Sequence, residues 1–252
     1  MRGKTVFITG ASSGIGKATA HLFAEQGARL LLCARRIDRL AELARELDTA
    51  EDIFTFRLDV QDRAAVDQTL ANLPEEWRTV DILINNAGLS RGLSKIYEDN
   101  PEDWEEMLDT NVKGLLYVTR AIVPGMLSRG SGHIINLGST AGHQTYANGA
   151  VYCASKAAER VITEGLRIDL NGTPVRVTSI DPGMVETDFS LVRFHGDVER
   201  AAKIYQNITP LQPADVADAI FWAVTRPLHV SVHTVLLTSI DQANSTVFSR
   251  RG

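Results

Sequence analysis

Hydrophobic residues along this chain form short continuous runs, separated by longer stretches in which apolar residues recur every three or four positions. The runs predict buried β-strands, and the longer stretches predict amphipathic helices that cover them. The predicted strands are Thr5 to Thr9, Arg29 to Ala34, Ile53 to Leu58, Ile82 to Asn85, Gly132 to Leu137, Arg176 to Ile180 and Thr234 to Leu237. The predicted helices are Lys17 to Gln26, Ile37 to Leu47, Ala64 to Leu73, Asp103 to Arg129, Tyr152 to Leu170 and Ala214 to Thr225.

The alternation of strand and helix predicts how the layers are arranged. Each helix carries the chain back across the sheet, so the strands pair in parallel, and right-handed crossovers place helices on both faces. We therefore expect a single α/β domain over residues 1–252, built on a doubly wound parallel sheet of the Rossmann type. The rhythm breaks at 183–208, a connection long enough to predict a substrate-binding loop or lid.

A glycine-rich turn follows the first predicted strand and leads into the first predicted helix. It reads Thr-Gly-Ala-Ser-Ser-Gly-Ile-Gly at residues 9–16. Glycine permits the tight turn and lets the backbone approach a pyrophosphate, while the helix N-terminus offers free N–H groups to the anion. In this position the motif predicts dinucleotide binding. The residues expected to contact the dinucleotide here are Gly10, Ser12, Ser13, Gly14, Ile15 and Gly16.

The end of the second predicted strand indicates which nicotinamide cofactor binds. An enzyme for NAD typically carries an acidic residue there, which holds the ribose 2′-hydroxyl. This chain has Arg35 and Arg36 instead, and guanidinium groups form charge-assisted hydrogen bonds with a 2′-phosphate. The predicted cofactor is therefore NADP(H). The residues that fall where the adenine and its ribose should lie are Asp59 and Val60 after the third strand, and Asn86, Ala87 and Gly88 after the fourth.

Tyr152 and Lys156 stand four positions apart at the start of a predicted helix, so both lie on one helix face. An ammonium this close to a phenol stabilises the phenolate form, which lets a tyrosine exchange a proton near neutral pH. In a carbonyl reduction, negative charge develops on the carbonyl oxygen as hydride reaches the carbon. Hydroxyl groups from Ser139 and Tyr152 would stabilise that charge as the proton arrives.

Together these motifs resemble those of the short-chain dehydrogenase/reductase family, over nearly the whole chain. The resemblance rests on the glycine-rich turn, Asn-Asn-Ala-Gly at 85–88, Asn111, Ser139, Tyr-x-x-x-Lys at 152–156, and Pro182-Gly183 with Thr187. It implies that Ser139 binds the substrate oxygen, that Tyr152 transfers the proton, and that Lys156 binds the nicotinamide ribose. It also implies that Asn111 holds a water linked to Lys156. The residues implied to orient the nicotinamide are Pro182, Gly183, Val185 and Thr187.

The C-terminal third is similar to the branch of that family that oxidises 3-hydroxy acids such as serine, allo-threonine, 3-hydroxyisobutyrate and 3-hydroxypropionate. The similar segments are 192–197, 205–207 and 227–230. Arg193, in the long loop, is the predicted ligand of the substrate carboxylate, because guanidinium forms paired hydrogen bonds with carboxylates. We therefore predict an NADP-dependent 3-hydroxy acid dehydrogenase.

Two other functions stay open. A 3-oxoacyl or general carbonyl reductase of the same family is disfavoured because 236–241 lacks the Asp-Gly-Gly segment that commonly follows the last strand of acyl-carrier-type reductases. A non-catalytic NADP-sensing protein is disfavoured because a pure binder has no need of Asn111, Ser139, Tyr152 and Lys156.

The charge and composition of the chain favour small molecules as its binding partners. A formal net charge of -5 disfavours a nucleic-acid binder, and no apolar stretch approaches the length of a membrane span, so we expect a cytoplasmic protein. Cys33 and Cys153 form no Cys-x-x-Cys pair, and the histidines show no ligand spacing, so we expect no metal. The resemblance implies a homotetramer or homodimer, assembled through the outer faces of the helices at 103–129 and 152–170.

Overall fold

A computed structural model describes residues 1–47 and 52–250, and its centre is a sheet of seven parallel strands. The strands are β1 (Thr5–Thr9), β2 (Arg29–Ala34), β3 (Ile53–Arg57), β4 (Ile82–Asn85), β5 (Gly132–Leu137), β6 (Val175–Pro182) and β7 (Thr234–Leu237). Their order is β3-β2-β1-β4-β5-β6-β7. The order reverses between β1 and β4, the switch point at which such sheets bind ligands. The predicted doubly wound Rossmann fold is confirmed, although 48–51 and 251–252 of the predicted domain lie outside the described residues.

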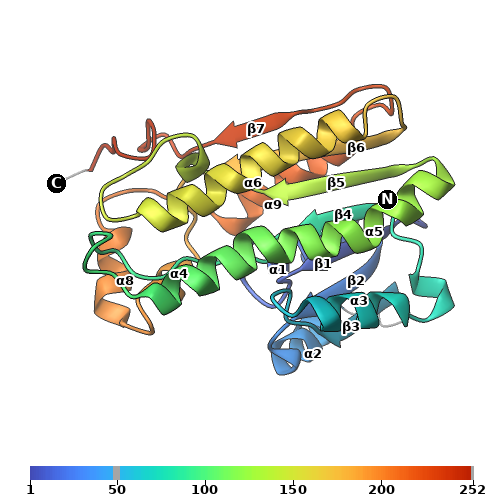
Figure 1. Ribbon diagram of the computed structural model, residues 1–252, viewed down its shortest axis with the longest axis horizontal. Helices are drawn as coiled ribbons and strands as arrows, with labels where there is room; N and C mark the ends of the chain where they lie inside the picture. The colour runs from blue at the N-terminus through green and yellow to red at the C-terminus, as the bar shows by residue number, and fades with distance from the viewer. Residues whose placement is uncertain (48–51, 251–252) are drawn as a thin grey trace.

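Helices cover both faces of this sheet (Figure 1). They are α1 (Gly14–Glu25), α2 (Ile37–Glu46), α3 (Arg63–Ala71), α4 (Pro101–Leu108), α5 (Leu115–Arg129), α6 (Ala150–Asp169), α7 (Phe189–Arg193), α8 (Val198–Ile204) and α9 (Pro213–Val224). α1, α2 and α9 pack on one face, and α3, α5 and α6 pack on the other. Within the described ranges, no helix combines the length and the apolar composition needed to cross a bilayer.

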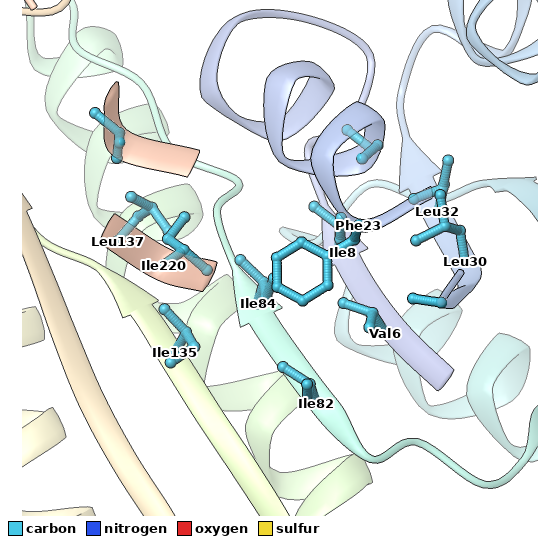
Figure 2. Close-up of a cluster of buried hydrophobic side chains, with 14 of the residues drawn as sticks. Val6, Ile8, Phe23, Leu30, Leu32, Ile82, Ile84, Ile135, Leu137 and Ile220 are labelled. Carbon is cyan, nitrogen blue, oxygen red and sulfur yellow. The ribbon is translucent and has the colours of Figure 1, made fainter. Parts of the chain in front are cut away.

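Successive residues of each strand point into opposite layers of the core. In β1, Val6 and Ile8 pack toward α1, α2 and α9, whereas Phe7 packs toward α3, α5 and α6. Figure 2 shows the first of these layers, in which Phe23 of α1 lies over the strands. The ring of Phe23 meets Phe221 of α9 edge-on, with 5.5 Å between ring centres. Burial on both faces explains why the strands appear in the sequence as continuous apolar runs.

The predicted helix Asp103 to Arg129 is wrong as a single α-helix. The chain forms α4, then a π-helical segment η3 (Asp109–Gly114), and then α5. A Cβ atom on Gly114 would lie 2.6 Å from Cγ2 of Val60, so the glycine lets this wide turn pack closely against the loop after β3. A π-bulge adds one residue to a helix and leaves its overall apolar repeat almost unchanged. Periodicity therefore could not reveal it.

The connection at 183–208 contains α7 and α8 and docks onto the segment before α4. The backbone N–H of Gly92 donates to the carbonyl oxygen of Arg193 at 2.9 Å, and Arg91 donates to the carbonyl oxygen of Val192. Figure 1 places α8 beyond the carboxyl ends of the strands, on the side to which the arrowheads point. The connection thus lies at the edge of the sheet where ligands bind.

Candidate active site

The loops that follow the strands enclose a cavity of about 840 Å³, a volume typical of ligand sites. The predicted site residues that line it are Gly10, Ser12, Ser13, Gly14, Ile15, Arg35, Arg36, Asp59, Val60, Asn86, Ala87, Gly88, Ser139, Tyr152, Lys156, Pro182, Gly183, Val185, Thr187 and Arg193. Two further predicted residues, Gly16 and Asn111, are buried and do not belong to the lining. Segments from most of the chain therefore meet in one place.

The glycine-rich turn leaves its backbone open toward the cavity. Gly10 and Gly14 have positive φ angles of 65° and 53°, a conformation that favours glycine. A Cβ atom on Gly10 would lie 2.9 Å from Cα of Ala87, and one on Gly16 would lie 2.6 Å from the carbonyl oxygen of Gly10. Side chains are excluded at these positions, and α1 begins at the turn. The cradle fits the pyrophosphate of a dinucleotide.

Arg36 faces this turn. Its Nη2 donates to Oγ of Ser13 at 2.9 Å and to Oγ of Ser12 at 3.3 Å. Burial lowers the pKa of Arg36 below its ordinary value, and the positive charges of Arg39 and Arg35 lower it further. An anion bound here would relieve that repulsion. The cluster thus fits the extra phosphate that distinguishes NADP from NAD.

Arg35 also lines the cavity, but its guanidinium has a partner. Nη1 of Arg35 lies 3.4 Å from Oε1 of Glu106 on α4. Hydrogen bonds from Arg91 and then from Arg35 hold the pKa of Glu106 below its ordinary value, against the opposing effect of burial. The two predicted arginines therefore differ in position, since Arg36 faces the phosphate cradle and Arg35 joins the end of β2 to α4.

Ser139 and Tyr152 present their side chains to the same cavity. Ser139 caps the short helix η4 (Thr140–Gly142), and its Oγ accepts a 3.1 Å hydrogen bond from the backbone N–H of Ala141. The hydroxyl proton of Ser139 is therefore free to be donated to a ligand. Tyr152 lies in the first turn of α6, where its ring meets Phe189 of α7 edge-on with 5.6 Å between ring centres.

Lys156 lies one helical turn beyond Tyr152 and also lines the cavity. Its Nζ donates to the carbonyl oxygen of Leu137 and to Oε2 of Glu159, each at 2.7 Å. Burial disfavours the ammonium form, but the nearby Glu159, Tyr152 and Asp181 outweigh it and hold the pKa of Lys156 above its ordinary value. The lysine is thus a cation beside Tyr152. Sequence reasoning missed Glu159, whose only signal was an acidic residue on the buried face of α6.

Asn111 lies in the π-helical segment η3, and only 1% of its surface is exposed. Its Nδ2 donates to the carbonyl oxygen of Leu89 at 2.8 Å and to Oγ of Ser155 at 3.0 Å, while its Oδ1 accepts from the N–H of Leu89 at 2.9 Å. A Cβ atom on Gly88 would lie 3.3 Å from Oδ1 of Asn111 and 3.6 Å from Nζ of Lys156. The space that a side chain on Gly88 would occupy therefore borders both groups, and a water between them stays a prediction.

Arg193 extends from α7 into the cavity. Its Nε donates to Oγ of Ser90 at 3.0 Å and its Nη2 donates to Oη of Tyr146 at 2.9 Å. Burial raises the pKa of Tyr146, so both partners are neutral hydroxyl groups. Within residues 1–47 and 52–250, no carboxylate forms an ion pair with this guanidinium. Sequence reasoning found Arg193 but missed Ser90 and Tyr146, which show no motif of their own.

A second group that sequence reasoning missed ties the Ser139 loop to the sheet. Nε2 of His143 lies 2.5 Å from Oδ2 of Asp181 on β6, and Oγ of Ser179 donates to the other oxygen of the same carboxylate. Asp181 is 1% exposed, so this contact fixes η4 against β6. In the part of the chain that the structure describes, no three His, Cys, Asp or Glu side chains form a cluster able to hold a metal.

Comparisons with known proteins agree with this geometry. The model of the short chain dehydrogenase family matches residues 4–196. The NADP-dependent 3-hydroxy acid dehydrogenase YdfG of Salmonella typhi is 49% identical over 239 residues, which cover 94% of this chain and 96% of the relative. Sulfoacetaldehyde reductase 2 of Chromohalobacter salexigens is 46% identical over 239 residues, which cover 94% of this chain and 95% of that relative. The closed form of serine dehydrogenase complexed with NADP+ matches with a TM-score of 0.93 and 46% identity, over 98% of this chain and 100% of that one.

Proposed function

This chain belongs to the short-chain dehydrogenase family, and on that basis we propose that it is an NADP-dependent 3-hydroxy acid dehydrogenase. The enzyme interconverts a small 3-hydroxy acid, of the serine, allo-threonine, 3-hydroxyisobutyrate or 3-hydroxypropionate type, with its 3-oxo acid or semialdehyde. The observation that carries the substrate class is the guanidinium of Arg193, which faces the cavity beside Tyr152 without a carboxylate partner among the described residues. The relatives described as 3-hydroxy acid and serine dehydrogenases support it.

The cradle and the cation cluster assign the cofactor. In this proposal, the glycine-rich turn holds the pyrophosphate and Arg36, with Ser12 and Ser13, holds the 2′-phosphate. Lys156 donates to the nicotinamide ribose, using an N–H beyond the two that contact Leu137 and Glu159. NADP, when bound, supplies the acceptor for the hydride that leaves the substrate carbon, and returns it in the opposite direction. The remaining cofactor-binding residues in the proposal are Gly10, Gly14, Ile15, Gly16, Arg35, Asp59, Val60, Asn86, Ala87, Gly88, Pro182, Gly183, Val185 and Thr187.

The chain's own residues manage the proton. In the oxidation direction Tyr152, as phenolate, takes the proton of the substrate hydroxyl, while Ser139 donates a hydrogen bond to the same oxygen. The ammonium of Lys156 favours the phenolate by its charge. In reduction the steps run backward, and the two hydroxyl groups stabilise the negative charge that develops on the carbonyl oxygen. A positioned acid or base of this kind contributes about 100- to 10,000-fold in rate.

Arg193 selects substrates that carry an anion near the reacting hydroxyl. Guanidinium forms paired hydrogen bonds with a carboxylate, and Ser90 and Tyr146 hold its plane in place through Nε and Nη2. The same donors suit the oxygens of a sulfonate. Because one relative is described as a sulfoacetaldehyde reductase, the second candidate reaction is the interconversion of sulfoacetaldehyde and the corresponding hydroxy sulfonate.

A substrate panel tests the proposal. The purified protein is offered serine, allo-threonine, 3-hydroxyisobutyrate, 3-hydroxypropionate and the hydroxy sulfonate, each with NADP and with NAD, and the absorbance of the reduced cofactor is followed. We expect turnover of at least one 3-hydroxy acid and a strong preference for NADP. Turnover of a 3-oxoacyl thioester or an uncharged ketone, with none of these acids oxidised, would support the carbonyl reductase instead. Binding of NADP without turnover of any substrate would support the non-catalytic sensor.

We extend the proposal to the assembly and location of the protein. Outward-facing apolar side chains on α5 and α6, namely Leu116, Val161 and Ile168, are 42%, 56% and 68% exposed, and such surface favours association. We expect a homodimer or homotetramer, and light scattering that showed only monomer would contradict it. Cys33 and Cys153 are buried free thiols, which agrees with a reducing cytoplasmic compartment. Fractionation of cells tests that location.

A further inference from the structure

A carboxylate that the proton transfer does not use lies directly against Lys156. Glu159 follows Lys156 by three positions on α6, so the two side chains share a helix face. Nζ of Lys156 donates to Oε2 of Glu159 at 2.7 Å, and their side chains are 8% and 2% exposed. Solvent therefore screens this pair very little. The carboxylate acts on the lysine at close to full strength.

The pair is not explained by stability alone. Within the described residues, Oε1 of Glu159 has no hydrogen-bond partner, and a buried polar atom left without a partner is costly. Buried ion pairs are often no more stable than apolar side chains of the same volume. Apolar residues in place of both partners would avoid that cost, whereas loss of Glu159 alone leaves the buried Lys156 without its counter-ion. We therefore expect the carboxylate of Glu159 to act mainly on Lys156.

Burial and the charges around Glu159 have opposing effects on its pKa. Burial raises the pKa of Glu159 to about 7, Lys156 lowers it, and Asp181 on β6 raises it. Asp181 is itself in contact with His143, which follows η4. Tyr152 lies one turn along α6 on the far side of Lys156. Lys156 therefore lies between Tyr152 and Glu159 along the helix, and its ammonium interacts with both of them.

We propose that Glu159 is a positioning residue for the reaction, which acts through Lys156. It keeps the buried lysine charged and holds Nζ beside the carbonyl oxygen of Leu137, and its negative charge limits how strongly that lysine stabilises the phenolate of Tyr152. Because Glu159 acts through roles proposed above for Lys156 and Tyr152, its assignment rests on the proposed function.

Two consequences follow from removing the negative charge while keeping the shape of the side chain. In Glu159→Gln the carboxylate that offsets the charge of Lys156 is absent, so the lysine stabilises the phenolate of Tyr152 more strongly and this phenolate forms at lower pH. Lys156 loses its counter-ion, so burial drives part of the protein into a form with a neutral lysine and a neutral phenol. The first effect moves the pH profile, and the second reduces the maximum rate. A residue that only supports the fold would change neither profile nor rate once the protein is folded.

The test compares pH profiles of kcat/KM for oxidation in the wild type, Glu159→Gln and Glu159→Met. In both variants we expect the midpoint of the rising limb of the pH profile to move down by about 0.5 to 1.5 pH units. A unit charge one or two helical turns away, at intermediate screening, has an effect of this size. We expect kcat to fall about tenfold and KM for the substrate to stay within about twofold. Glu164→Gln, on the exposed face of the same helix, is the matched control and should leave the profile unchanged.

A binding measurement separates this assignment from the choice of substrate. NADPH fluorescence titrations at about pH 6 and about pH 9 report on Lys156 without any turnover. Between the lower and the higher pH, we expect the NADPH affinity of Glu159→Gln to fall about fivefold more than the NADPH affinity of the wild type falls, because Lys156 loses its charge in the variant. If no 3-hydroxy acid is oxidised but this difference appears, the substrate proposal fails and Glu159 keeps its role. A variant that folds with an unmoved pH profile and unchanged binding overturns the role of Glu159, as does a failure of both variants to fold.

Discussion

The guanidinium carbon of Arg193 lies 5.2 Å from the centre of the Tyr152 ring. The cation proposed to bind the substrate anion and the phenol proposed to take the substrate proton therefore face the same part of the cavity. This short separation favours substrates whose acid group lies only a few bonds from the reacting hydroxyl. In a substrate with a bulky acyl chain, any charged group would lie much farther from the reacting hydroxyl. The spacing between these two groups is thus the basis of the predicted selectivity.

Arg193→Met should weaken binding of the acid while leaving the cofactor site intact. The loss of charge-assisted hydrogen bonds predicts a rise in KM for the 3-hydroxy acid of about 10- to 100-fold, with KM for NADP within about twofold. Arg193→Lys should recover part of the loss. Arg200→Met, on the exposed α8, serves as the control. An equal loss of activity toward an uncharged ketone would show that Arg193 acts on the fold instead.

Tyr152→Phe should remove turnover and retain cofactor binding. Only the hydroxyl is lost, and the ring keeps its edge-on contact with Phe189, so we expect the rate to fall by about 100- to 10,000-fold. NADPH affinity, measured by fluorescence, should change by less than about threefold. Tyr97→Phe alters a ring that is 76% exposed and should have no effect. A variant that retains more than a tenth of the wild-type rate would exclude Tyr152 as the proton donor.

Arg36→Met and Arg35→Met should differ, although the residues are adjacent. Arg36 contacts the hydroxyl groups of Ser12 and Ser13, whereas Arg35 is paired with Glu106. We therefore expect KM for NADP to rise about 10- to 100-fold in Arg36→Met and by no more than about threefold in Arg35→Met. KM for NAD should change little in either variant. Kinetics with both cofactors check this, and a larger effect at Arg35 would reverse the assignment.

Phe23→Ala should destabilise the face of the sheet covered by α1 and α9. The side chain is fully buried and packs against Phe221, so its removal should lower the free energy of unfolding by about 3 to 5 kcal/mol. Urea denaturation measures this change. Leu228→Ala removes a side chain that is 85% exposed and should change the stability by less than about 0.5 kcal/mol. Similar values for the two variants would contradict the described core.

Glu159 should also make stability depend on pH. Burial raises the pKa of Glu159 from 4.5 to about 7, so between these values the folded chain holds a proton that the unfolded chain has released. Stability is therefore greater at the acid end of this window and falls as the pH rises through it. The difference in free energy of unfolding between wild type and Glu159→Gln should decline by about 3 kcal/mol from about pH 5 to about pH 8. Urea denaturation across that range tests it, and a difference that stays constant or increases would contradict the inferred burial.

The sequence predicted the fold well because both kinds of element left a clear periodic pattern. β1, β2, β4, β5 and β7 have the predicted bounds, since each is a short apolar run with polar or glycine residues at its ends. The predicted positions of the helix ends were less accurate. α1 begins at Gly14 rather than Lys17, because the glycine-rich turn already contributes its first turn to the helix.

The site was predictable only as far as its residues belong to short motifs. The glycine-rich turn, Tyr152 and Lys156 form local patterns, and the cavity gathers them as expected, although their roles stay predictions. Glu159 and Tyr146 were missed because their partners are fixed by packing between segments rather than by spacing along the chain. The different environments of Arg35 and Arg36 likewise depend on where α4 lies, which no local pattern records.

The packing of α1 against α9 has a consequence for how the protein is made. Phe23 leaves the ribosome well before Phe221, which covers it, because the two residues are far apart along the chain. Until then, the apolar face of the nascent chain around β1 has no lasting cover, and contacts between such distant segments form slowly. Chaperone dependence and aggregation during expression should therefore respond more to substitutions on α9 than to equally destabilising ones on α2.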